Sequence, residues 1–458
     1  MSREVRVAEG STAKLAVVDV ALLVGEDATV TAEDGVKVTV NGAVECEGNC
    51  EFQCSVEAYR FEGSDGHIRV QGDLTVKDRI KVEDGSLEVS GSINAETIKV
   101  DRSLTVGKDL TADDVDVGGR VEVHGITKAR KIDVGGSYRA QGQVEADDID
   151  IGGSLDVEAP VKLTTIDVGG RAKIGGGEVT GRIDVGGSFE STGPLSFNSI
   201  DVGGAVRLAA GSSGQSIDVG GTLRVEGDLR FNSIDVGGAV EISGAADGHS
   251  VDVGGQLQVG GDLRLTGKLE VGGAVRVAKE LSSEQVDVGG SVEAWTVSAR
   301  DDVNVGGLLA TERGTKARRV EVGRRGEARG PLVAEEVYIG ERARVDDIYA
   351  QRLTMEENAR ARNLYVGRAS IESGCRVSGE TQYLETLETE RDVLFAKPPV
   401  KVEKLPTLSI GAETIKCEAK PTVEAPAAPA KEEATYCPSC GAKNVREANF
   451  CTNCGTRL

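Results

Sequence analysis

The sequence contains few aromatic residues, few histidines and no long apolar run. Aromatic residues make up 3% of the 458 residues, and the three histidines, His67, His124 and His249, are scattered along the chain. Ligand pockets are usually lined by aromatic and apolar side chains, and no P-loop or other catalytic cluster is present. The best apolar stretch, residues 15–24, is shorter than the roughly 20 residues of a membrane-spanning helix. We therefore expect neither an enzyme nor a transmembrane segment.

The balance of charge argues against one class of partner. The chain carries 75 acidic and 53 basic residues, which gives a formal charge of −22. Nucleic-acid binding requires a basic surface for phosphate contacts, so we expect no nucleic-acid partner. No secretory signal pattern opens the chain, and several of its 9 cysteines have no evident disulfide partner. We therefore expect a reducing, cytoplasmic compartment.

Glycine, in contrast, is abundant, and many of the 61 glycines belong to a repeated motif, Ile-Asp-Val-Gly-Gly. The middle residue of the motif recurs every 17 residues, apart from one interval of 18 between Val253 and Val271. With degenerate copies there are 15 such positions: Val100, Val117, Val134, Ile151, Val168, Val185, Val202, Val219, Val236, Val253, Val271, Val288, Val305, Val322 and Ile339. A fixed short period over such a length is typical of a solenoid.

One repeat predicts the shape of each turn. Residues 216–232 divide into three short segments that alternate apolar and polar residues and stop at Gly, Asn or another small polar residue. This alternation indicates strands with one buried face, and Gly suits a corner with positive φ. We predict an all-β fold, a three-sided parallel β-helix with 17-residue turns. The inward residues of this turn are Ile217, Val219, Leu223, Val225, Leu229 and Phe231, and the outward ones include Asp218, Arg224 and Arg230.

Changes in composition divide the chain into five parts. We predict an irregular N-terminal β segment or cap (1–64), a regular β-helix (65–312) and an Arg-rich, degenerate end of the β-helix (313–379). A tail with a Pro- and Ala-rich linker (380–435) and a small C-terminal domain (436–458) follow. A single turn cannot bury a core alone, so stacking stabilises the rod. Open sheet edges at its ends need a cap or recruit another strand.

The C-terminal domain contains four cysteines with metal-ligand spacing. The pairs Cys437/Cys440 and Cys451/Cys454 are C-x-x-C motifs, each followed by Gly, and ten residues separate them. Four thiolates close a tetrahedral site, which is typical of structural Zn²⁺, and so short a segment needs the metal to fold. Disulfides are the alternative. The segment resembles the short zinc ribbons at the termini of many bacterial and archaeal proteins, which implies a module that docks onto an unknown protein partner.

Three further cysteines, Cys46, Cys50 and Cys54, suggest at first a second metal or iron–sulfur site. They share one parity with Phe52 and Val56, however, while acidic and polar residues occupy the other parity. We interpret this pattern as a buried strand face in which Cys serves as a small hydrophobic residue.

The second residue of the motif forms an acidic column: Asp116, Asp133, Asp150, Asp167, Asp184, Asp201, Asp218, Asp235, Asp252 and Asp287, with Glu270 in the same column. In a β-helix these side chains stand outward about 4.8 Å apart, and their repulsion should raise their pKa values. Two interpretations remain open. The Asp is copied by duplication and bonds locally to the next backbone groups, or the column binds divalent cations or a basic partner.

Two other charged regions differ from this column. The column five residues after the motif valine has mixed sign, as in Glu122, Arg139, Asp156 and Lys173, which relieves repulsion. Residues 313–329 contain seven basic and two acidic residues. They form either a solvated basic face or an end surface that recognises an acidic partner, such as another copy of the chain.

The glycine-punctuated turns, such as residues 217–221, and the later stretches 337–340 and 346–350 resemble bactofilins over roughly residues 65–375. The resemblance implies a right-handed β-helix that polymerises end to end without nucleotide, as part of a prokaryotic cytoskeleton. The rod here is longer, its N-terminus is β-like, and a zinc ribbon is appended. The leading prediction is a scaffold that self-assembles head to tail and presents the ribbon. The alternative is a monomeric, adhesin-like rod that binds cations or a partner through the acidic column. An enzyme of the carbohydrate-active β-helix type is disfavoured, because the acidic column is too repetitive to single out a catalytic pair.

Overall fold

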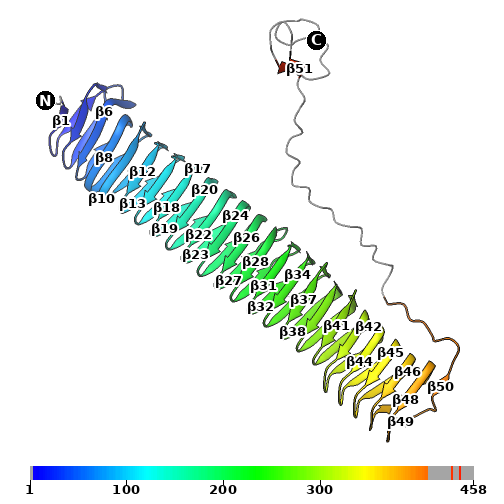
Figure 1. Ribbon diagram of the computed structural model, residues 1–458. Helices are drawn as coiled ribbons and strands as arrows, with labels where there is room; N and C mark the ends of the chain where they lie inside the picture. The colour runs from blue at the N-terminus through cyan, green and yellow to red at the C-terminus, as the bar shows by residue number, and fades with distance from the viewer. Residues whose placement is uncertain (1–3, 411–434, 437–442, 445–458) are drawn as a thin grey trace. The chain divides into compact units, whose positions relative to one another are not determined.

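The computed structural model describes residues 4–410, 435–436 and 443–444, and the chain divides into two units, Met1–Ile410 and Gly411–Leu458. The first unit is a rod of stacked parallel strands, coloured from blue at β1 to orange at β50 in Figure 1. Among the described residues there is no helix, which confirms the predicted all-β class. Accordingly, the described part of the chain contains no helix that is long and apolar enough to cross a membrane.

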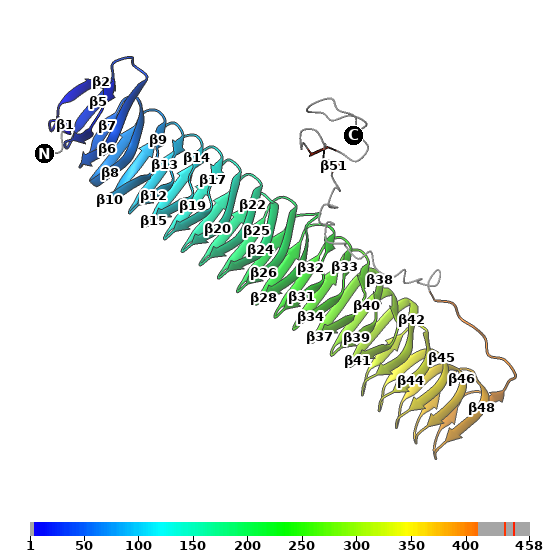
Figure 2. The same cartoon turned by 45° about the horizontal axis from the view of Figure 1, so that its top comes forward.

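Each turn of the rod consists of three short strands. One turn is formed by β28 (Ser213–Val219), β29 (Thr222–Val225) and β30 (Leu229–Arg230). The next turn begins with β31 (Ser233–Val236), which pairs in parallel with β28 so that each residue lies beside the one 17 positions later. About 23 turns stack in this way, as Figure 2 shows along the whole rod. The predicted three-sided parallel β-helix is confirmed.

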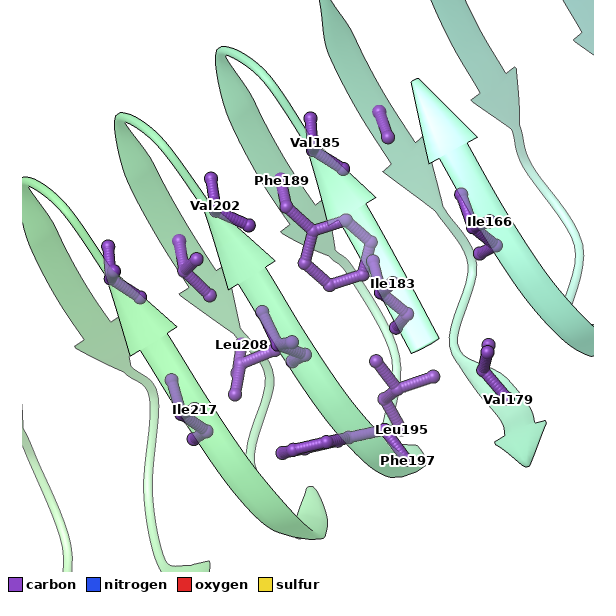
Figure 3. Packing of buried hydrophobic residues seen from close by; sticks show 14 of the residues in the cluster. Ile166, Val179, Ile183, Val185, Phe189, Leu195, Phe197, Val202, Leu208 and Ile217 are labelled. Carbon is purple, nitrogen blue, oxygen red and sulfur yellow. The ribbon is translucent and has the colours of Figure 1, made fainter. Parts of the chain in front are cut away.

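Along most strands of the rod, alternate side chains point inward, and together they form one continuous core. The six inward residues predicted for one turn are all buried: Ile217, Val219, Leu223, Val225, Leu229 and Phe231. The predicted outward residues are exposed: Asp218, Arg224 and Arg230. Figure 3 shows an equivalent turn in which Ile183, Phe189 and Leu195 come from the three faces and meet in the interior. Each turn therefore covers the inward side chains of the turns on either side of it.

The Gly-Gly corners are required by close stacking of the turns. The repeated pairs, such as Gly220 and Gly221, do not adopt positive φ, although Gly211 and Gly227 elsewhere do. A Cβ added to Gly220 would stand 2.5 Å from the carbonyl oxygen of Gly203 in the preceding turn. The prediction that these corners need positive φ was therefore wrong. Glycine is needed because a side chain would collide with the backbone of the preceding corner.

The N-terminal segment predicted as an irregular cap belongs to the same solenoid. β1 (Glu4–Val7) pairs in parallel with β4 (Ala21–Val24), β4 with β6 (Lys37–Glu47), and β6 with β8 (Ser55–Val70). The spacing between paired residues changes from 17 to 22, and then to 18 and 17 within the pairing of β6 with β8. This variation hides the repeat in the sequence. The described part of the solenoid therefore starts at Glu4, well inside the segment 1–64 that was predicted as a cap.

The rod also continues through residues 313–379. β45 (Arg344–Met355) pairs with β46 (Arg360–Ile371) at a spacing of 16 residues, and β46 pairs with β48 (Thr381–Thr389). Gly-Gly corners give way to corners with a single positive-φ residue: Arg325, Arg342, Asn358, Gly374 or Asp392. A different corner and a shorter turn explain why the repeat looks degenerate here.

The last strands of the rod are β49 (Leu394–Phe395) and β50 (Val400–Lys401). Residues 402–410 then turn back along the side of the rod (Figures 1 and 2). The first unit therefore ends at Ile410, so the predicted boundary at residue 379 lies inside it.

Candidate functional sites

The acidic column lies along one face of the rod, in register. Each member is the penultimate residue of its strand, from β15 (Asp114–Val117) to β39 (Gln285–Val288). Asp116 lies beside Asp133, and the column continues turn by turn to Asp287. Strands stack about 4.8 Å apart, so each carboxylate inside the column faces two like charges.

Basic side chains interrupt this column at intervals. Four of them lie within 3.5 Å of its carboxylates, in the groups Lys99–Asp116, Lys131–Asp133, Arg182–Asp184/Asp201 and Lys268–Glu270. Arg182 bridges two turns, at 2.8 Å from Asp184 and 2.7 Å from Asp201. These contacts are exposed, so each contributes little to stability, but they offset the repulsion along the column.

The repulsion persists where no cation intervenes. Partial burial, and then the charges of Asp218 and Asp252 on either side, raise the pKa of Asp235. Burial and the neighbouring charges also raise the pKa of Asp167. The pKa rises at these two positions as predicted, but burial contributes more to the rise than the repulsion named in the prediction.

A metal site on the column is not supported. Among the described residues, no group of three or more His, Cys, Asp or Glu side chains is arranged to hold a metal ion. Ca²⁺ takes six to eight oxygen ligands and Mg²⁺ needs an octahedral set. Single carboxylates stacked at strand spacing do not converge on one point. The geometry therefore agrees better with an Asp that was copied by duplication and is tolerated on the surface than with a column that binds divalent cations.

The mixed-sign column forms ion pairs between turns. Arg139 lies 3.4 Å from Asp156, which is its partner in the next turn, and Arg224 lies 2.6 Å from Glu241 in the same relation. Alternation of sign along a stacked column thus replaces repulsion by attraction, as the sequence predicts.

Most of the basic residues between 313 and 329 are also paired. Arg318 contacts Asp301 and Asp302, while the other pairs are Arg319–Glu336, Arg324–Glu341 and Arg329–Glu327. Arg313 lies over the exposed ring of Trp295, 6.0 Å from its centroid. These acidic partners come from neighbouring turns as well as from the segment itself. The expected basic end surface is therefore largely neutralised within the rod.

The three N-terminal cysteines lie in the core. Cys46, Cys50 and Cys54 are each 3% exposed and carry free thiols. Burial raises the pKa of Cys46 and of Cys54, which keeps both thiols protonated. Their interpretation as small hydrophobic residues is confirmed.

The N-terminal end of the rod presents unpaired strand edges. Within the described residues, β1, β2 (Thr12–Leu15) and β3 (Val17–Val18) pair only on the side that faces the rod. Val5 is 37% and Val17 is 63% exposed. The first described turn is therefore an open end of the sheet with apolar side chains around it.

The C-terminal end has the same character. Within the described residues, β49 pairs only with β47 (Arg376–Val377), and β50 pairs only with β48. Leu394 is 56% and Val400 is 54% exposed. The inward side chains of the last turn, including Leu387 and Phe395, are only partly buried because no further described turn covers them. Sequence reasoning missed this end because it placed the end of the rod at residue 379.

In the second unit, two short strands are described. β51 (Thr435–Tyr436) and β52 (Lys443–Asn444) pair antiparallel. They flank the first C-x-x-C pair in the sequence, so the six residues between them carry two of the predicted ligands. The full predicted set, Cys437, Cys440, Cys451 and Cys454, lies outside the described residues. Four thiols at this spacing are a complete donor set for tetrahedral Zn²⁺.

The comparison with known families identifies one module. The model of a zinc-ribbon domain family matches residues 436–458, which is the predicted C-terminal domain. This match supports a zinc-binding ribbon at the end of the chain. Neither the curated proteins nor the solved structures contain a match to the chain. The likeness of the rod to bactofilins therefore stays a prediction.

Proposed function

We propose that this protein is a structural scaffold: a β-helical rod that joins further copies end to end, without nucleotide, and carries a zinc-ribbon docking module. The observation that carries the proposal is the pair of open, apolar ends. The edges of β1, β2 and β3 at one end and of β49 and β50 at the other lack a partner among the described residues. Unpaired strand edges of this kind recruit further strands.

The two ends are suited to each other. Both belong to the same three-sided parallel solenoid, so the first turn of one copy can continue the last turn of another in parallel. Such a contact joins two different surfaces and leaves a free end on each side, which generates a filament. Burial of Val5 and Val17 against Leu394 and Val400 supplies apolar contact area.

The charge of the rod favours growth along its axis. The formal charge of −22 and the acidic column oppose lateral contact between rods. The resemblance to bactofilins supports the same behaviour. A cytoplasmic location, a protein partner for the ribbon, and the absence of catalysis and of nucleic-acid binding belong to this proposal.

Negative-stain electron microscopy of the full chain, purified without nucleotide, tests the proposal. We expect unbranched filaments of uniform width. Val17→Asp and Leu394→Asp place a charge at opposite ends and should each give separate rods. Mixed together, these two variants each keep one intact end and should form dimers that cannot grow.

Ile126→Asp is the matched control, since Ile126 is 43% exposed in the middle of the rod, away from both ends. Its filaments should equal those of the unmodified chain. Isolated rods of the unmodified chain at every protein concentration would overturn the proposed assembly. Filaments from the mixed variants would show that the contact is not head to tail.

A further inference from the structure

Residues 402–410 follow the last strand and lie along the flank of the rod (Figures 1 and 2). The segment starts with a hydrogen bond in which Val402 N donates to Tyr383 O over 2.9 Å. Residues 403–409 are exposed, apart from the half-buried Leu405, and no hydrogen bond joins residues 403–410 to another described residue. Ile410 is only 8% exposed. One side chain at the end of the segment therefore holds it.

Ile410 occupies a slot beside Gly314 and Pro331. A Cβ built on Gly314 would stand 2.6 Å from Ile410 Cδ1, 2.6 Å from Pro331 O and 2.8 Å from Pro331 Cγ. Gly314 also has a φ of +119°, which other residues rarely adopt. Glycine is thus needed at position 314 both for the backbone conformation and for the space that Ile410 fills.

The slot lies well back from the end of the rod. In register, Val400 stacks on Gln382, and the column continues through Tyr365, Tyr349 and Val333 to Lys316, the second residue after Gly314. These five steps correspond to about 24 Å. The chain from Lys401 to Ile410 spans about 30 Å when fully extended. The segment is therefore almost fully extended, and it runs back along the rod toward its N-terminal end.

We propose that residues 402–410 form a latch whose Ile410 binds the Gly314–Pro331 slot and holds the segment against the flank of the rod. Only the burial of Ile410 offsets the conformational entropy that is lost when this mostly exposed segment is ordered, so the latch opens and closes. While it is closed, β49 and β50 stay uncovered. When it opens, residues 402–410 stay tethered beside these strands and obstruct the end contact. This last consequence rests on the proposed function, whereas the latch does not.

The test uses the full chain with Ile410→Asp, and Leu408→Asp as the matched control. Leu408 belongs to the same segment but is 37% exposed. Limited trypsin digestion, followed by mass spectrometry, reports cleavage after Lys404. We expect cleavage to be at least about tenfold faster with Ile410→Asp, because the buried isoleucine is lost, and unchanged with Leu408→Asp.

The single tryptophan gives a second measurement that does not depend on assembly. Trp295 directly precedes Thr296, which lies beside Gly314 in the sheet. Its emission should shift with Ile410→Asp and stay constant with Leu408→Asp, while both variants keep the melting temperature of the rod. Cleavage and emission like those of the unmodified chain would overturn the latch. If cleavage is faster with Ile410→Asp but neither the variants nor the unmodified chain form filaments, the latch stands and the proposed assembly is overturned.

Discussion

The carbonyl oxygen of Gly220 lies 2.7 Å from the position that a Cβ on Gly237 would occupy. The two residues stand one above the other in successive corners, so the Gly-Gly pairs set how closely the turns stack. A methyl group at position 237 must push two turns apart or distort both strands. The corner is therefore the part of the repeat that tolerates substitution least.

Gly237→Ala should destabilise the rod by about 1–3 kcal/mol, the typical cost of overpacking. Thermal unfolding followed by circular dichroism measures the effect. Arg102→Ala is the matched control, because Arg102 occupies the equivalent corner, below Gly119, and already carries a side chain that is exposed. It should leave the transition unchanged. Equal melting temperatures for Gly237→Ala and the unmodified chain would show that the corners have room to relax.

A buried hydroxyl pair gives a second prediction. Tyr138 OH donates a hydrogen bond of 2.7 Å to Thr127 Oγ1, and both residues are 0% exposed. Tyr138→Phe leaves the Thr127 hydroxyl without this partner in the core, which should cost about 1–3 kcal/mol. Tyr138→Phe combined with Thr127→Val removes both polar groups and should recover much of that loss. Chemical denaturation of Tyr138→Phe, Thr127→Val and the double variant measures the free energy of unfolding of each. If the loss in the double variant equals the sum of the two single losses, the two hydroxyls do not interact.

The acidic column predicts a pH-dependent gain in stability. The pKa of Asp235 is raised in the folded rod above its ordinary value of 3.8. The folded state therefore binds the proton more tightly than the unfolded chain. At a pH above the pKa of the folded state, the charged Asp235 carboxylate lowers the free energy of unfolding of the rod. This loss of stability disappears as the pH falls below the ordinary pKa of the carboxylate. Asp235→Asn should raise the melting temperature at pH 7 and have no effect near pH 3.

The gain from Asp235→Asn is small, about 0.2–0.5 kcal/mol, because solvent screens an exposed side chain, and added salt should reduce it further. Asp116→Asn is the control, since Asp116 lies 2.9 Å from Lys99 Nζ and its charge is compensated. It should give no gain at pH 7. Equal stabilisation by both substitutions would mean that repulsion along the column is not the cause.

The turn and its core were predictable from the sequence because most turns between residues 100 and 322 repeat the same inward and outward positions, apart from local register shifts. The repeat was not recognised in residues 4–64 because the paired residues there are 17, 18 or 22 positions apart. The reason for glycine at the Gly-Gly corners was also not predictable from the sequence, because only the stacked structure brings the Gly203 carbonyl against Gly220.

The acidic column shows the same limit for candidate sites. Its register followed directly from the repeat, but its ion pairs did not. Arg182 compensates Asp201 from the preceding turn, and a contact of this kind depends on side-chain conformations that a one-dimensional pattern does not contain. The slot for Ile410 lies 96 positions earlier in the chain, at Gly314, and no local signal connects the two residues.

The zinc ribbon should bind one Zn²⁺ per chain and leave the rod unaffected when the metal is removed. Its segment, residues 436–458, belongs to a unit separate from the rod, and four cysteines supply a closed ligand set. Metal analysis of the purified chain should show zinc, which Cys437→Ser should remove or strongly reduce. Cys417→Ser is the control, because Cys417 lies outside the C-x-x-C pairs, and it should keep the zinc.

The main thermal transition, which reports the rod, should be the same with and without a chelator. Zinc retained at full occupancy in Cys437→Ser would place the metal elsewhere, and loss of the main transition on chelation would mean that the rod needs the ribbon to fold.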